Sequence, residues 1–305
     1  MVVTLHTKLT PGGGSGVDVF FVLSGWLITG ILLIEFGRAG TISYRAFLLR
    51  RARRLLPALF LMLAAYAAWA LCTSGPLLPI LFAATSTTDL RECLGATHSP
   101  IGHTWSLGVE WQFYVLWPAI VALIAGRKFA VPIMITVWGL LTLVRSMAFA
   151  AHLHDFAYFS PLHSTGLFIG AALALGPSEP ARRWVGWLGL AAILVTILVA
   201  PDGWRSPEAW LIPIAEVGAA GVILSPPRFL RWAPLVWIGT ISYGLYLWHL
   251  PIWFALAGLS NDIVRAILTL ALTIGVSAAN WRWLEQPILR GGRRASLPII
   301  EAATP

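Results

Sequence analysis

The sequence predicts an all-α protein, a polytopic membrane helix bundle, and three observations support this fold class. The 305 residues are 58% hydrophobic and 11% charged, whereas about 25% of the residues in a soluble domain are charged. The mean hydropathy is +0.78, and several apolar runs reach the roughly 20 residues that a helix needs to cross a bilayer. Irregular backbone and open sheet edges are not stable in lipid, so the spans are expected to be helices.

The elements follow in order from the N-terminus. Residues 1–6 are typical of the last turn of a helix whose beginning is absent, and residues 12–16 form a flexible glycine connector. Residues 1–294 are expected to form one integral membrane domain, and residues 295–305 a short, disordered cytoplasmic tail. Nine full spans are expected, at residues 17–35, 55–71, 106–125, 129–148, 159–176, 184–200, 209–225, 235–257 and 263–283.

Arginine and lysine predict the orientation, because short cytoplasmic loops carry an excess of them. If residues 36–54 are cytoplasmic, alternation of the spans places fifteen of the 21 basic residues on that side. These are Arg38, Arg45, Arg50, Arg51, Arg53, Arg54, Arg127, Lys128, Arg182, Arg183, Arg228, Arg231, Arg290, Arg293 and Arg294. The C-terminus is then cytoplasmic, and the predicted location is a bacterial-type inner (plasma) membrane. The net charge of +8 is explained by orientation and predicts no nucleic-acid partner.

The one sizeable outer loop, at about residues 72–105, contains both cysteines, Cys72 and Cys93. On the exported side of a bacterial-type membrane, the two thiols can oxidise to a disulfide. Two buried free thiols are the alternative. The sequence leaves both interpretations open.

The run HTWSLGVEWQFYVLWP places an acid inside a predicted span. His103, Ser106, Glu110, Tyr114 and Trp117 follow one another at steps of three and four, so they share one helical face. A carboxylate roughly seven residues into a span lies about 10 Å below the surface. An unpaired acid at that depth costs about 2.5–3.5 kcal/mol. The stripe therefore predicts either a site inside the bundle or a structural clamp between helices.

A histidine and an aspartate lie near the expected outer ends of the first helices. His6 precedes the glycine connector, and Asp18 shares a helical face with Phe21, Gly25 and Thr29. Histidine is the natural general base for taking a proton from a hydroxyl near neutral pH. An ordinary interfacial histidine is the competing interpretation of His6.

The segment FLLRRARRLLP contains Arg-x-x-Arg twice at the cytoplasmic start of a span, as Arg50 with Arg53 and as Arg51 with Arg54. Guanidinium forks suit the phosphate groups of a nucleotide-bearing cofactor. The alternative is an orientation signal that also contacts anionic lipid headgroups.

A second polar stripe lies in WIGTISYGLYLWHLP, where Ser242, Tyr246 and His249 fall at i, i+4 and i+7. Hydrogen bonding between helices is its expected role. No metal-ligand spacing, Walker loop or dinucleotide fingerprint is present in the sequence, so no metal is expected.

Lone charges at depth are candidates for a function, and a structural Glu–Arg pair is the alternative. Glu216 lies in the middle of a span, whereas Arg145 and His163 lie toward the outer ends of theirs. Arg282 and Glu285 close the last span and are expected to pair with each other.

Together these motifs resemble the acyltransferase-3 family of integral membrane O-acyltransferases. The resemblance covers residue 2 to about 290 and depends on VVTLH, GVDVFFVLSGWLITGILL, FLLRRARRLLPAL, HTWSLGVEWQFYVLWP, YFSPLHSTGLFIGAALAL, IGTISYGLYLWHLPI and WRWLEQP in this order. It implies a ten-helix domain that takes an acyl group, usually acetyl, from cytoplasmic acyl-CoA. The implied acceptor is a hydroxyl of a glycan, a lipid-linked sugar or a small natural product.

The resemblance also implies roles for individual residues. His6 matches the family's proposed catalytic histidine, and Arg51 with Arg54, or Arg50 with Arg53, matches the arginine pair required for activity. Also carried over, from the two best-matching stretches, are Asp18, Ser106 and Glu110. The implied partners are the lipid bilayer, acyl-CoA and the hydroxyl-bearing acceptor.

The sequence departs from the family pattern at two places. The family's first helix begins with a basic residue well before the histidine, but only five residues precede His6. The sequence is therefore expected to be an N-terminally truncated relative, with a start assigned too far downstream as the alternative to a real loss of the first helix. Asn280 and Trp281 stand where a Ser-Tyr pair is common. A transporter or flippase, or an inactive relative, are the alternative functions.

Overall fold

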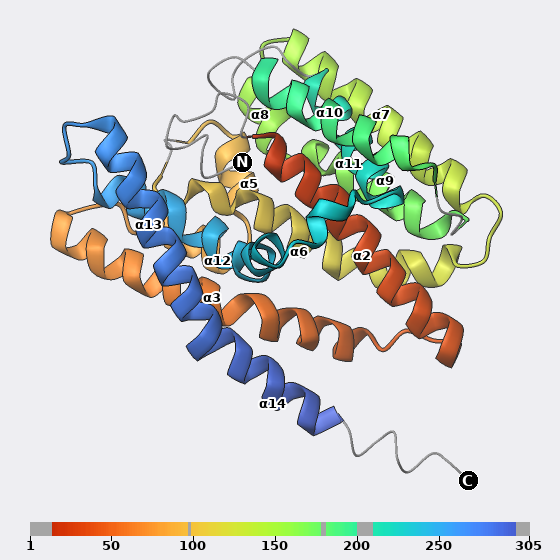
Figure 1. The fold of residues 1–305 in the computed structure, drawn as a ribbon, viewed down its shortest axis with the longest axis horizontal. Coiled ribbons are helices and arrows are strands. Elements are labelled where there is room, and N and C mark those ends of the chain that lie inside the picture. The colour runs from red at the N-terminus through yellow and green to blue at the C-terminus, as the bar shows by residue number, and fades with distance from the viewer. Residues whose placement is uncertain (1–13, 97–98, 178–180, 200–209, 297–305) are drawn as a thin grey trace.

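The computed structural model describes residues 14–96, 99–177, 181–199 and 210–296, and throughout these residues the regular structure is helical, without a strand (Figure 1). The long helices are α2 (Ser15–Ala39), α3 (Tyr44–Thr73), α6 (Trp105–Ile124), α7 (Ala130–Ala150), α12 (Ala233–Ala255) and α13 (Asp262–Asn280). The shorter helices are α4 (Leu78–Ala84), α5 (Thr88–Cys93), α8 (His154–Phe159), α9 (Thr165–Leu175), α10 (Arg183–Val199), α11 (Leu211–Leu224) and α14 (Gln286–Ser296). The 3-10 turns are η1 (Gly102–Thr104), η2 (Pro161–Ser164) and η3 (Arg228–Arg231), and η4 (Trp281–Glu285) is a π-helical turn.

Five helical segments are long and apolar enough to cross a membrane. They are Ser15–Ala39, Tyr44–Thr73, Gly102–Ile124, Ala130–Ala150 and Asp262–Gly291. Two further apolar helices, α10 and α11, are shorter, with 17 and 14 residues. The predicted all-α membrane bundle is therefore confirmed, and the described helices supply five candidate spans.

Two predicted boundaries differ from the structure. Helix α3 begins at Tyr44, and not near residue 55, because the arginine-rich segment is itself helical; arginine is a good helix former. The span predicted at 159–176 is interrupted, and its long helical part begins only at Thr165. Ser160 is extended (φ −74°, ψ 168°) before Pro161, since proline disfavours helical geometry in the residue that precedes it.

Close helix packing brings α9 against α2. A Cβ atom added to Gly25 would lie 2.1 Å from the carbonyl oxygen of Leu167, and one added to Gly170 would lie 2.1 Å from the carbonyl oxygen of Val22. Small residues allow such approach between membrane helices. Figure 1 shows α7 to α11 grouped on one side of α2, with α3, α12 and α13 on the other.

Helix α6 lies at the centre of the bundle. Half of its span window is buried (50%), compared with 22% for α7. Its apolar side chains, among them Val109 and Trp117, pack in one cluster with Phe21 and Ile28 of α2 and Leu167 of α9. The polar residues that share α6 are consequently held inside protein, away from lipid.

The ends of the chain and the cysteines complete the comparison with the predicted elements. Cys72 is exposed near the end of α3 and Cys93 is half-buried at the end of α5, and both are free thiols. Helix α14 continues through Ser296, and residues 297–305 of the predicted tail lie outside the described residues. His6 and the predicted end of the first helix also lie outside them.

Candidate functional site

Glu110 is the centre of the polar interior that the sequence predicted. Its side chain, on α6, is almost completely buried. The hydroxyl of Ser24 on α2 donates to Oε1 of Glu110 at 2.8 Å, and the hydroxyl of Tyr114 donates to the same oxygen. Tyr114, which the sequence predicted on the same helical face one turn after Glu110, is therefore its hydrogen-bond partner. Ser24 was not predicted, because helical periodicity gives the face of a residue but not the helix that it meets.

Two arginines of α3 act on this carboxylate. Arg51 and Arg54 both interact electrostatically with Glu110 and with Tyr114. The Nε atom of Arg51 is buried and has no hydrogen-bond partner among the described residues, and its guanidinium lies 5.6 Å from the ring centroid of Phe47. Arg54 is exposed, so a positively charged and accessible group lies within electrostatic reach of the buried acid.

The other two predicted arginines are placed differently. Arg50 forms an ion pair with Glu35 of α2 at 2.8 Å, in which both side chains are partly exposed. Arg53 is exposed. Of the two overlapping Arg-x-x-Arg pairs, the structure brings Arg51 and Arg54 together with Glu110.

Asp18 pairs with a histidine that the sequence analysis treated as a lone charge. Nε2 of His163 lies 2.7 Å from Oδ1 of Asp18, and Nδ1 lies 2.6 Å from the carbonyl oxygen of Tyr158. Nδ1 carries a proton, because a carbonyl only accepts. Both side chains are buried, and the rings of Trp105 and Phe21 pack on the imidazole, with centroid distances of 5.1 and 6.2 Å.

Arg145 and Glu216, two further lone charges of the sequence analysis, belong to one buried network. Nη1 of Arg145 donates to the hydroxyl of Thr165 at 2.7 Å, and this hydroxyl donates to Glu216. Nε1 of Trp138 donates to the second oxygen of Glu216 at 2.7 Å. Arg145 also interacts electrostatically with Asp18. These helices therefore contain the structural alternative, a Glu–Arg pair, in which the hydroxyl of Thr165 bridges Arg145 and Glu216.

The second predicted stripe is split between the interior and the surface. Oγ of Ser106 lies 2.6 Å from the hydroxyl of Tyr246, which donates to the carbonyl of His103. His249 is buried, and its Nδ1 lies 2.6 Å from the carbonyl oxygen of Tyr246. Tyr246 therefore hydrogen-bonds across to the neighbouring helix, as the stripe predicted. Ser242 does not, because it is exposed and donates to the carbonyl of Gly239 in its own helix at 2.9 Å.

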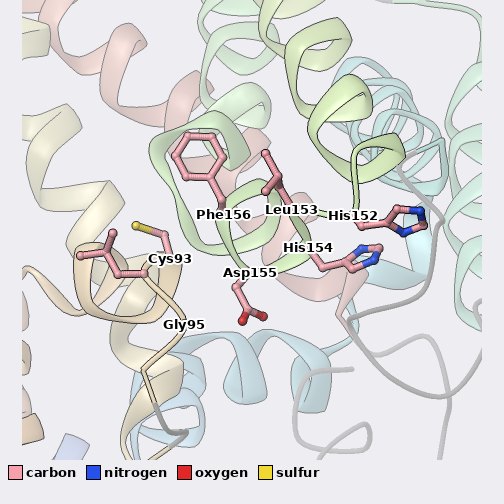
Figure 2. A pocket seen from close by; sticks show the side chains of 8 residues that line it. Cys93, Gly95, His152, Leu153, His154, Asp155 and Phe156 are labelled. Atoms are coloured by element: carbon pink, nitrogen blue, oxygen red, sulfur yellow. The ribbon is translucent and has the colours of Figure 1, made fainter.

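A pocket of about 400 Å³ lies at the end of the bundle that carries α5 and α8. It is lined by residues 93–95 and 152–156 (Figure 2). The rings of His152 and His154 lie side by side, with centroids 5.7 Å apart, and the carboxylate of Asp155 points away from them. The described residues contain no group of three or more His, Cys, Asp or Glu side chains that could hold a metal ion.

These features define a class of protein: a helical membrane protein whose buried carboxylate faces basic residues inside the bundle. The family described as the acyltransferase domain matches residues 2–282. The chain therefore belongs to the acyltransferase-3 family.

Curated relatives carry names that agree with this family. The chain is 30% identical to the peptidoglycan O-acetyltransferase OatA of Listeria monocytogenes, over 95% of this chain and 54% of the relative. It is 28% identical to the putative peptidoglycan O-acetyltransferase YrhL of Bacillus subtilis, over 96% and 54%. The chain thus spans about half the length of these relatives. No solved structure matches it.

Proposed function

We propose that the chain moves an acetyl group from cytoplasmic acetyl-CoA to a hydroxyl of a cell-envelope glycan. The observation that carries this proposal is the buried Glu110 of α6 within electrostatic reach of Arg51 and Arg54 of α3. A carboxylate suits the orientation of a histidine base that takes a proton from a hydroxyl, and guanidinium groups suit the phosphates of CoA. The relatives named peptidoglycan O-acetyltransferases support a glycan as the acceptor.

The order of the polar groups along α2 supports a path from one membrane face to the other. Asp18 lies six residues before Ser24 in the sequence, or about 9 Å along the helix axis, and Ser24 contacts Glu110. Arg38 lies in the last turn of the same helix. With the arginine-rich end cytoplasmic, the donor arrives from the side of Arg54 and the acceptor from the side of Asp18. The proposal includes nine full spans and part of a tenth, and a cytoplasmic C-terminus in the inner membrane.

The proposed chemistry is nucleophilic attack on a thioester. The acceptor oxygen bonds to the acetyl carbonyl carbon as a general base takes its proton, the carbon–sulfur bond breaks, and the proton passes to the CoA thiolate. The base in this proposal is His6, which matches the family's proposed catalytic histidine, and Asp18 or Glu110 orients it. Ser106, one turn before Glu110 on α6, contacts Tyr246 of α12, and the ring of His249 lies 5.0 Å from that of His103. Direct transfer and a covalent acyl-enzyme both fit these residues.

The test uses membranes that contain the protein, incubated with radiolabelled acetyl-CoA and glycan. The expected result is label on the glycan that mild alkali releases, as an ester requires. His6→Ala should abolish the transfer and leave membrane insertion intact. Arg51→Gln and Arg54→Gln should raise KM for acetyl-CoA, whereas the matched control Arg38→Gln should leave it unchanged. Absence of alkali-labile label with the wild-type protein would overturn the proposal.

A further inference from the structure

Glu285 is a buried carboxylate near the cytoplasmic end of the last long helix. It ends the π-helical turn η4, between α13 and α14. Such turns are rare overall, but where they occur they often lie at functional sites. Glu285 is buried, at 4% exposure, while Arg282 and Trp283 of the same turn are exposed. The predicted pairing of Arg282 with Glu285 is therefore wrong, because the turn directs the two side chains into different surroundings.

The partners of Glu285 lie inside the bundle. Nδ2 of Asn280 donates to Oε1 of Glu285 at 3.0 Å. The turn η4 packs against α3, the helix that carries the arginines, and Arg54 is the charged group that acts on Glu285. A buried carboxylate needs an opposite charge to offset the loss of hydration, and Arg54 acts on it through space.

Tyr243 of α12 connects this carboxylate with the central site. Its hydroxyl donates at 2.8 Å to the carbonyl of Leu55, the residue after Arg54. The hydroxyl group of Tyr243 interacts electrostatically with Glu110, Glu285 and Arg54. Arg54 consequently acts on two buried acids that come from different elements, Glu110 of α6 and Glu285 of η4.

We propose that Glu285 is a positioning residue of the acyl-donor site, which holds the guanidinium of Arg54 where it meets the anionic groups of acyl-CoA. This inference depends on the proposed function. Arg54 has a long and exposed side chain, and fixing such a chain before a ligand binds reduces the entropy that binding loses. Without Glu285, Arg54 keeps its charge but samples more rotamers, so donor binding weakens while the chemical step is preserved.

The experiment measures KM for acetyl-CoA, kcat and direct CoA binding by calorimetry in detergent, and an unfolding midpoint checks the fold of each variant. Glu285→Gln keeps the size of the side chain and removes its charge. It should raise KM and Kd for the donor about tenfold and leave kcat within about twofold. The double variant with Arg54→Gln should lose no more donor affinity than Arg54→Gln alone, because the two side chains act as a unit.

Glu35→Gln is the matched control, since Glu35 also pairs with an arginine of α3 but in the exposed hairpin; it should leave KM unchanged. If Glu285→Gln does not fold, Glu285→Asp takes its place and should give a smaller rise in KM. An unchanged KM in the folded variant, or additive losses with Arg54→Gln, would overturn the positioning role. If only the positioning role is wrong, the wild-type protein still transfers acetyl and Arg54→Gln still binds the donor more weakly. If the proposed function is wrong, neither the wild-type protein nor any variant transfers acetyl.

Discussion

At the scale of single residues, Glu110 accepts hydroxyl hydrogen bonds from Ser24 and Tyr114 on one oxygen. Arg51 and Arg54 act on the same carboxylate. Hydrogen bonds to charged groups are stronger than neutral ones, so the two hydroxyls fix the acid in one orientation. An acid fixed in this way suits proton transfer better than a merely structural contact requires.

Glu110→Gln should therefore lower kcat for acetyl transfer by about 10²-fold, because general base catalysis by His6 loses the negative charge that orients the histidine and stabilises its protonated form. The amide keeps the shape of the side chain but carries no charge. Ser24→Ala should have a smaller effect, about tenfold, since it removes one hydrogen bond to the acid. Kinetics in detergent would measure both, and a Glu110→Gln enzyme with wild-type kcat would reduce Glu110 to a structural role.

The network of Arg145 and Glu216 predicts an effect on stability. Glu216→Leu leaves the guanidinium of Arg145 buried without its counter-charge, and breaking a buried pair costs about 3–5 kcal/mol. The double variant Arg145→Met/Glu216→Leu should lose less than Glu216→Leu alone, because no charge is left behind. Unfolding midpoints in detergent would measure this, and equal losses in the single and double variants would contradict the pairing.

Helical spacing predicted which residues share a face, and the structure agrees for Glu110 with Tyr114. Spacing could not predict that Asp18 meets His163 or that Thr165 separates Arg145 from Glu216. Those contacts join helices that are distant in the sequence, and they depend on crossing angles that a hydropathy pattern does not contain.

At the scale of helices, the α2–α9 contact depends on glycine. The Cβ of an alanine at Gly25 or Gly170 would lie 2.1 Å from a backbone oxygen of the other helix, so the helices must move apart. Gly170→Ala should destabilise the protein by about 1–3 kcal/mol, as overpacking does.

The control for this prediction is Gly30, also in α2, where a Cβ meets nothing within 4 Å. Gly30→Ala should be neutral or stabilise the helix by up to about 1 kcal/mol. Unfolding midpoints of the two variants would be compared. Equal midpoints for Gly170→Ala and Gly30→Ala would show that the helices do not pack this closely.

Hydropathy predicted most helices but missed where two of them begin. It placed the start of α3 near residue 55, because a segment rich in arginine is not apolar, although it is helical. It also continued one helix through Pro161, where the chain turns before Thr165. Proline and arginine determine local backbone structure more directly than they affect mean hydropathy.

At the scale of the whole molecule, the distribution of arginine predicts the orientation, and the structure offers a thiol to test it. Cys72 is free and exposed in the last turn of α3, at the end that is predicted to face outward. A membrane-impermeant maleimide should label it in intact spheroplasts, and Cys72→Ser should remove most of the label, since Cys93 is half-buried. Labelling only after the cells are opened would reverse the predicted topology.

The membrane class, the family and the central acid all follow from the sequence, because charge is scarce and motifs recur in a fixed order. The number of spans does not, since helices of 11 to 17 residues, such as α9 and α10, fall below the length that defines a span. In the structure α9 packs against the longer helices α2 and α7, and α10 packs against α11.

The most direct test of transmembrane acetyl transfer uses the protein in sealed vesicles, with labelled acetyl-CoA on one face and glycan on the other. We expect alkali-labile label on the glycan when the donor is on the face of Arg51 and Arg54, and none when the donor and the glycan change places. Equal labelling from both faces, or no label from either, would contradict the account.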